Sequence, residues 1–189
     1  GSYLLSDFLR GRFGTEWAMS LHAAADTVVL LTDADMAFIA CEASALNVAR
    51  TYRGITNGAA IESDGDLEFT YSGVNLKPLS PVYLNGNRHP STNDWTLEWL
   101  RRTRVDGALR DFVDAALGEA SESYEIEIYD GSGYATVKRT ITATSQTCAY
   151  TSAQQVADFG SNRSTLYVKV YQLSATVGRG YPLTATITR

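Results

Sequence analysis

The most constraining feature of the sequence is a series of short segments, from Pro81 to Thr188, in which apolar and polar residues alternate. In the stretch TLYVKVYQL, for example, Leu166, Val168 and Val170 alternate with Tyr and Lys residues. A period of two is typical of a strand with one buried face, and Gly-rich stretches such as YDGSGYA supply turns between strands. We predict strands in residues 81–86, 95–103, 123–131, 134–143, 148–153, 165–175 and 181–188. Many short strands with little helix favour an antiparallel β-sandwich.

The first part of the chain is less regular. It predicts a short helix in GTEWAMSLHAA, with Thr15 as N-cap, and a hairpin turn at SDGD. Strands are predicted in residues 27–32, 36–43, 48–55 and 66–73. Pro78 and Pro81 then favour an extended connector. We therefore expect a mainly β protein, with a small β-rich (α+β) domain in residues 1–78 and a sandwich in residues 79–189. The opening Gly-Ser resembles the remnant of a removed tag, so we expect a piece of a longer chain.

The stretch DWTLEWLRRTR raises the question of whether it is a binding surface or a core strand. Alternation places Trp95, Leu97 and Trp99 on one face, which predicts a buried strand. Trp95 lies nearer the start of this strand, so its loss is expected to destabilise the fold less than the loss of Trp99. The arginines that follow either form a binding patch or pair with nearby carboxylates. The candidate partners are Asp106, Asp111, Glu119 and Glu122.

Charge and composition exclude some partners. Residues 1–78 hold five basic and ten acidic residues, and residues 79–189 hold eleven of each. Neither part has the broad positive face of a nucleic-acid-binding protein, so no nucleic acid is expected. No apolar run approaches the length of a membrane-spanning helix, and none is expected. Cys41 and Cys148 are expected as inert buried thiols, although a disulfide between them stays open.

The sequence holds no recognisable catalytic constellation. Its two histidines, His22 and His89, have no nucleophile at a meaningful spacing, and no phosphate-binding or metalloprotease motif is present. We therefore expect no enzymatic activity, no cofactor and no resident metal. The acidic residues from Asp64 to Glu68 are expected as a solvated turn, with calcium as the alternative.

Loops and aromatic residues supply the candidate binding residues. The loops NGNRHPSTND and TVGRGYP contain Arg88, His89, Arg179 and Tyr181, which could stack on a partner or donate charged hydrogen bonds. Tyrosines in the strands, where they face outward, could stack on sugar rings, and sheet-face packing is the alternative.

The second half of the sequence resembles a fibronectin type III domain. A proline-led first strand, the Trp of LEWLRR in the second strand and the late segment VKVYQLSATVGRGYPLT carry this resemblance. The chain departs from the family at Leu166, where a corner tyrosine is usual. The resemblance implies that Trp99 is the central core aromatic.

A wider resemblance covers nearly the whole chain. LLSDFLRGRFGTEW, a following His and VVLLTD are similar to a signature of the large tail-tip proteins of siphophages and gene transfer agents. The segments ARTYRGIT, LKPLSPVYLNGNR, LEWLRRTRVDG, LGEASESYEIEIYDG, YTSAQQVADFG and VKVYQLSATVGRGYP follow in that family's order.

This resemblance implies a structural component of a tail tip or baseplate, located in the virion tail and extracellular when assembled. Other tail proteins would be its partners, and the full-length assembly would be a homotrimer. The alternative function is a module that itself binds a glycan or protein of the host envelope.

Overall fold

The computed structural model describes most of the chain, namely residues 6, 10–11, 14–23, 25–27, 34, 39–55, 57–63, 65–107, 111–113 and 115–189. The chain forms two compact units: Gly1–His22 together with Leu76–Arg189, and Ala23–Asn75. The sequence instead placed one boundary between residues 78 and 79, and independent folding of residues 79–189 stays a prediction. Among the described residues, no helix is long and apolar enough to cross a membrane.

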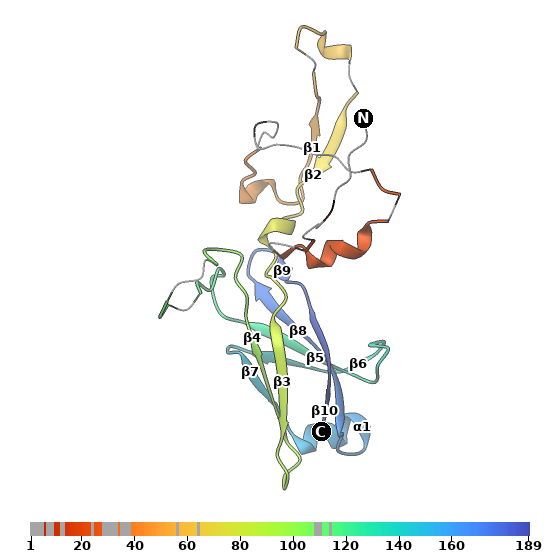
Figure 1. Cartoon of the computed structure of the whole chain (residues 1–189), viewed down its shortest axis with the longest axis vertical. Coiled ribbons are helices and arrows are strands. Elements are labelled where there is room, and N and C mark those ends of the chain that lie inside the picture. The colour runs from red at the N-terminus through yellow and green to blue at the C-terminus, as the bar shows by residue number, and fades with distance from the viewer. Residues whose placement is uncertain are drawn as a thin grey trace. The chain divides into compact units, whose positions relative to one another are not determined.

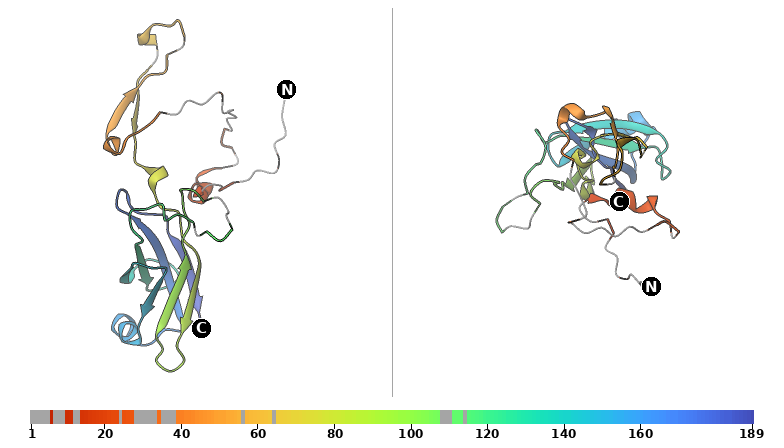
Figure 2. Two further views of the ribbon diagram at one scale, coloured as in Figure 1. Left: turned by 90° about the vertical axis from the view of Figure 1, so that its left-hand side faces the viewer. Right: turned by 90° about the horizontal axis from the view of Figure 1, so that it is seen from above.

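The first unit is an antiparallel β-sandwich (Figures 1 and 2). One sheet has the order β3-β4-β7, and the other has the order β10-β8-β5-β6 with β9 paired to β8. The bounds are β3 Val82–Arg88, β4 Trp95–Leu100, β5 Tyr124–Tyr129, β6 Val137–Ala143, β7 Thr147–Tyr150, β8 Thr165–Ser174, β9 Gly178–Arg179 and β10 Leu183–Thr188. The predicted mainly β class with an antiparallel sandwich is confirmed, and a strand lies in each of the seven predicted segments.

The core lies between the two sheets, as the alternation of β4 requires. Trp95, Leu97 and Trp99 are buried, and the residues between them are exposed. Trp99 packs edge-to-face on Tyr124, with ring centroids 5.1 Å apart. Trp95, at the start of β4, is buried as deeply as Trp99. Its side chain is fully buried, and its indole N–H donates to the carbonyl of Arg163, 3.1 Å away.

Helix α1 (Ser152–Phe159) lies where the sequence predicted the end of a strand in residues 148–153. The helix begins there because Thr151 and Gln154 form a capping box: the Thr151 side chain accepts from the Gln154 amide, and the Gln154 side chain accepts from the Thr151 amide. It ends at Gly160, which has a positive φ of 74° that favours glycine. The strand β7 therefore stops at Tyr150.

Gln155 of α1 closes one end of the sandwich. Its side chain is fully buried, and its amide group donates to the carbonyls of Asn93, at 2.8 Å, and Tyr150, at 3.3 Å. Its side-chain oxygen accepts from the amide of Arg163 at 3.0 Å. One side chain therefore joins the β3–β4 turn, the end of β7 and the approach to β8.

The first unit also contains a short 3-10 helix, Glu16–Leu21, in the predicted helical stretch. Thr15 stands at the predicted N-cap position and Glu16 in the first turn, although the Thr15 side chain accepts no capping hydrogen bond. Glu16 pairs with Arg102, with 2.7 Å between Oε1 and Nη1.

The second unit contains a two-stranded antiparallel sheet of β1 (Ala49–Tyr52) and β2 (Leu67–Thr70). Both strands lie within predicted segments. The strand predicted in residues 27–32 falls mostly outside the described residues. The strand predicted in residues 36–43 is wrong over its described part, because residues 39–42 form no strand and a 3-10 turn begins at Ala43. SDGD does not join two paired strands as predicted, because β2 pairs with β1 and residues 61–63 form a 3-10 turn within the connecting loop. Further 3-10 turns are Ala43–Ala45 and Val74–Leu76, the latter in the segment expected to be extended.

Candidate functional site

The two loops predicted to bind a partner lie at opposite ends of the sandwich. At one end, Arg88 of β3 pairs with Trp95 of β4, and the indole of Trp95 contacts the carbonyl of Arg163 near the start of β8. Helix α1 lies at this same end. Arg179 pairs with Leu173 at the far end of β8. Figure 1 shows the β3–β4 turn and α1 at one end and β9 at the other. The four predicted residues therefore form two separate groups.

His89 organises its own turn. Its Nδ1 accepts hydrogen bonds from the backbone amides of Ser91, at 3.3 Å, and Thr92, at 3.1 Å. The carboxylate of Asp94 accepts from the amide of Ser152 at the start of α1, and this bond lowers the pKa of Asp94. These hydrogen bonds hold the loop in place, so His89 and Asp94 have a structural role there that needs no ligand.

Tyr181 lines a cleft of about 460 Å³ between the 3-10 helix and the sandwich. Its ring stacks on Trp17, with centroids 5.3 Å apart and an interplanar angle of 8°, and Lys77 lies 5.6 Å from the ring centroid. The Glu16–Arg102 pair lines the same cleft. Tyr181 is thus used in packing the N-terminal segment onto the sandwich.

The arginines of LEWLRRTR are engaged in local contacts. Arg102 pairs with Glu16 and donates to the carbonyl of Ser80 at 2.8 Å. Arg104 pairs with Glu119 at 3.2 Å, and Arg101 lies 3.9 Å from a carboxylate oxygen of Glu122. The ion-pair alternative is therefore correct, although Glu16 was not among the expected partners. These residues follow β4, which ends at Leu100.

Arg179 points onto the outer face of the β10-β8-β5-β6 sheet. It forms ion pairs with Glu125 and Glu127, and its guanidinium lies 4.7 Å from the ring centroid of Tyr171. Arg179 therefore belongs to a polar cluster on this face rather than to a free loop.

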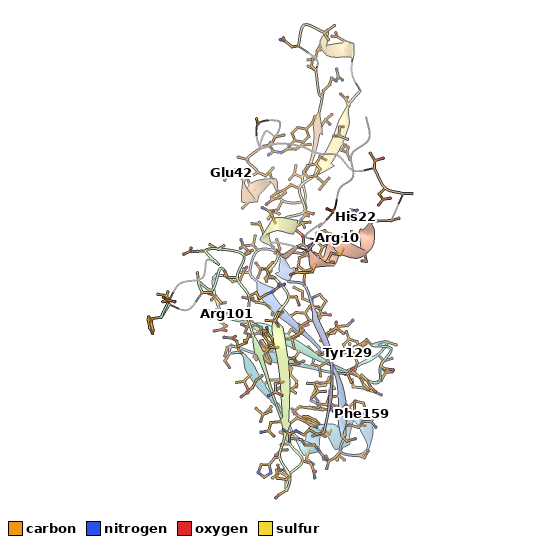
Figure 3. All side chains as sticks on the ribbon, in the orientation of Figure 1. Arg10, His22, Glu42, Arg101, Tyr129 and Phe159 are labelled. Atoms are coloured by element: carbon orange, nitrogen blue, oxygen red, sulfur yellow. The ribbon has the colours of Figure 1, made fainter. Side chains whose placement is uncertain are left out.

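The same outer face carries a group of residues that we call the tyrosine face. Its members are Tyr129, Tyr134, Tyr167, Lys169, Thr184 and Thr186. Tyr134 makes edge-to-face contacts with Tyr129 at 5.4 Å and with Tyr167 at 6.0 Å between ring centroids. The Tyr134 hydroxyl lies 3.2 Å from Oγ1 of Thr186. Figure 3 labels Tyr129, which lies on the side of the sandwich near β6.

Tyr129 forms the floor of the tyrosine face. It is 6% exposed, and its hydroxyl donates to Glu127 Oε2 at 2.5 Å. Burial raises the pKa of Tyr129 well above its usual range, and the hydrogen bond to Glu127 raises it further. The hydroxyl therefore remains a donor at neutral pH.

The sequence identified only part of this group. Tyr129 and Tyr167 lie in two of the predicted strands, and the structure brings them together as direct cross-strand neighbours. Tyr134 and Lys169 were missed, because a tyrosine in a Gly-rich turn and a lysine in a strand carry no signal without the strand register. Arg88 and His89 do not belong to the tyrosine face, because they lie in the β3–β4 turn at the α1 end of the sandwich.

The remaining sequence candidates have local roles or lie outside the described residues. Asp64 is outside them, whereas Asp66 accepts from Arg53 at 2.7 Å. Among the residues described, no group of three or more His, Cys, Asp or Glu is placed to hold a metal ion. Cys41 and Cys148 are both free thiols, and burial raises the pKa of Cys148 to about 12, which disfavours the reactive thiolate.

Two antiparallel sheets with the orders β3-β4-β7 and β10-β8-β5-β6 make up the sandwich. Among solved structures, the chain is similar to the FN5 domain of Drosophila Lar, with 12% identity, a TM-score of 0.35, and coverage of 59% of this chain and 95% of that domain. No protein-family model and no curated protein matches the chain.

Proposed function

We propose that the chain is a structural component of the tail tip or baseplate of a phage or gene transfer agent. Its partners would be other tail proteins, and its place would be the virion tail, outside the cell when assembled. The support from the sequence is the ordered series of segments that resemble large tail-tip proteins. Two of these segments, GRFGTEW and LEWLRRTR, contact each other through the Glu16–Arg102 pair. The resemblance is thus carried by residues that contribute to one folded unit.

The observation that carries the proposal is the β1–β2 hairpin of the second unit. Cross-strand pairing places Tyr52 opposite Leu67 and Arg50 opposite Phe69, so these four residues share one face. Leu67 is 67% exposed and Phe69 is 52% exposed. The opposite face carries Ala49, Thr51, Glu68 and Thr70.

This apolar face favours an assembled protein. A two-stranded hairpin is at best marginally stable by itself in water, and it gains stability when its apolar face packs on another surface. Burying two large apolar side chains contributes on the order of 1.5–3 kcal/mol each. We infer that the face of Leu67 and Phe69 docks against a neighbouring subunit of the tail.

The experiment replaces Leu67 and Phe69 with serine in the protein expressed with the other tail genes. The amount of the chain in purified particles is measured by quantitative mass spectrometry relative to the tail-tube protein. We expect incorporation to fall at least about tenfold, as for the loss of roughly 1.4 kcal/mol or more of docking energy.

The matched control changes the opposite face of the same hairpin, as Thr51→Ser with Glu68→Gln. This variant should be incorporated like the parent protein. Normal incorporation of the Leu67→Ser, Phe69→Ser variant would contradict docking through this face.

A second candidate function is a module that itself recognises the host envelope. The tyrosine face favours it, since half-buried aromatic rings lie beside hydroxyl and ammonium groups on an open sheet face.

A further inference from the structure

The strand register arranges the tyrosine face in two adjacent rows across the sheet. In the first row, Tyr129 of β5 lies beside Tyr167 of β8, which lies beside Thr186 of β10. In the second row, Glu127 lies beside Lys169, which lies beside Thr184. Rings and hydroxyl groups are therefore held side by side on rigid strands.

Tyr134 lies over both rows from the β5–β6 hairpin. Its ring contacts Tyr129 and Tyr167, and its ring centroid is 5.5 Å from Nζ of Lys169. Tyr134 adopts a positive φ of 49°, which a bulky residue rarely does, although glycines stand close by in the same turn. Such strain is often retained at functional sites. The hairpin thus holds an aromatic ring over the face at a conformational cost.

The charged groups on this face are balanced. Glu125 and Glu127 both pair with Arg179, and Glu127 also accepts from Tyr129. Lys169, although directly opposite Glu127, has no carboxylate partner among the described residues; its Nζ lies over the ring of Tyr129 at 4.9 Å. Two carboxylates and two cations leave no net charge, which disfavours a polyanionic ligand.

We propose that the tyrosine face binds a neutral saccharide. The ring of Tyr134 would stack on the apolar face of a sugar ring, and the ring of Tyr167, which lies at 85° to it, would contact the edge of the same sugar. Lys169 would donate hydrogen bonds to sugar hydroxyl oxygens, and the hydroxyls of Thr184 and Thr186, both exposed, can donate or accept. The proposal deepens the host-contact part of the proposed function and rests on it for its biological role.

The test starts with the full chain on an array of neutral oligosaccharides, namely glucans, galactans, mannans and N-acetylglucosamine oligomers. An acidic arm contains oligomers of galacturonic and sialic acid. For a neutral oligosaccharide that binds, the Kd is measured by titration calorimetry, and chemical-shift changes are mapped by nuclear magnetic resonance. We expect shifts concentrated in residues 129–137, 165–171 and 183–188.

The variants Tyr134→Ala and Lys169→Gln should each raise the Kd at least about tenfold, the effect of losing roughly 1.4 kcal/mol of contact energy. Tyr134→Phe keeps the stacking ring and should retain most of the affinity. The matched control is Tyr83→Ala, which removes a 79% exposed tyrosine from β3 in the other sheet and should leave the Kd unchanged.

Absence of binding to any neutral oligosaccharide, binding to the acidic arm alone, or equal affinity of the Tyr134→Ala variant would each overturn the proposal. Unfolding curves of every variant distinguish a lost contact from a lost fold. Incorporation of the Tyr134→Ala and Lys169→Gln variants into particles is measured in parallel. If the Tyr134→Ala and Lys169→Gln variants are incorporated normally but no longer bind sugar, both proposals are supported. If sugar binding is normal and the Leu67→Ser, Phe69→Ser variant is still incorporated, only the docking proposal is contradicted.

Discussion

Replacing Gln155 with leucine should strongly destabilise the sandwich, although the two side chains are similar in volume. The wild-type amide group donates to Asn93 at 2.8 Å and accepts from Arg163 at 3.0 Å, in a fully buried position. Leucine leaves this backbone carbonyl and this backbone N–H without their partner. Each buried unsatisfied group costs about 1–3 kcal/mol, so we expect a total loss of about 3–5 kcal/mol.

The assay is urea unfolding followed by tryptophan fluorescence, since Trp95 contacts the carbonyl of the same Arg163. With a slope of about 2 kcal/mol per molar urea, the midpoint should fall by roughly 2 M. Hydrogen exchange at the Arg163 amide should accelerate more than exchange in β5. The control Gln154→Ala removes half of the capping box and should cost about 1 kcal/mol.

A loss below about 1 kcal/mol for Gln155→Leu, or unchanged exchange at Arg163, would refute this reasoning. Either result would mean that the backbone groups find other partners, and that the buried amide does not join the two sheets.

Three further predictions concern the core and its ion pairs. Trp95→Ala and Trp99→Ala should each lower the free energy of unfolding by about 3–5 kcal/mol in chemical denaturation, and a cost for Trp95 below half of that for Trp99 would contradict its burial. Gln172→Leu should raise the melting temperature, with a gain of about 1–3 kcal/mol, because the buried Gln172 side-chain amide has no hydrogen-bond partner among the described residues. A lower melting temperature would show that the amide is satisfied. Burial opposes the ionisation of Asp158, but hydrogen bonds from Arg139 outweigh burial and lower the pKa of Asp158. The charged carboxylate therefore stabilises the fold above about pH 4, and this stabilisation is lost as the pH falls through the folded-state pKa. Asp158→Asn should therefore cost about 1–3 kcal/mol at pH 7 and progressively less below pH 4 in urea unfolding, and a cost independent of pH would argue against the charge.

The strands could be predicted from the sequence because a period of two is local information. The alternation in TLYVKVYQL and WTLEWL predicted the buried faces of β8 and β4, including Trp99. Helix α1 was missed, although the Thr151-x-x-Gln154 capping box and the later Gly160 are recognisable signals in the sequence. The strand pattern that ends at Tyr150 was extended too far, to residue 153, and so covered the start of the helix.

The candidate sites were harder to predict, because they depend on register and loop direction. Arg179 and Tyr181 are two residues apart, yet one contacts the outer sheet face and the other the cleft beside Trp17. Nothing in the composition of TVGRGYP distinguishes these directions. The tyrosine face likewise needs the pairing of β5 with β8 and the strained turn at Tyr134.

The central claim, that the chain is a structural component of a tail tip, is tested most directly by locating it in the particle. Antibodies against residues 79–189 are gold-labelled and applied to purified tailed particles from the cells that encode the protein, and the particles are imaged by electron microscopy. The account predicts label at the tail end distal to the head. Complete particles that lack the chain, or label confined to the head or tail tube, would contradict it.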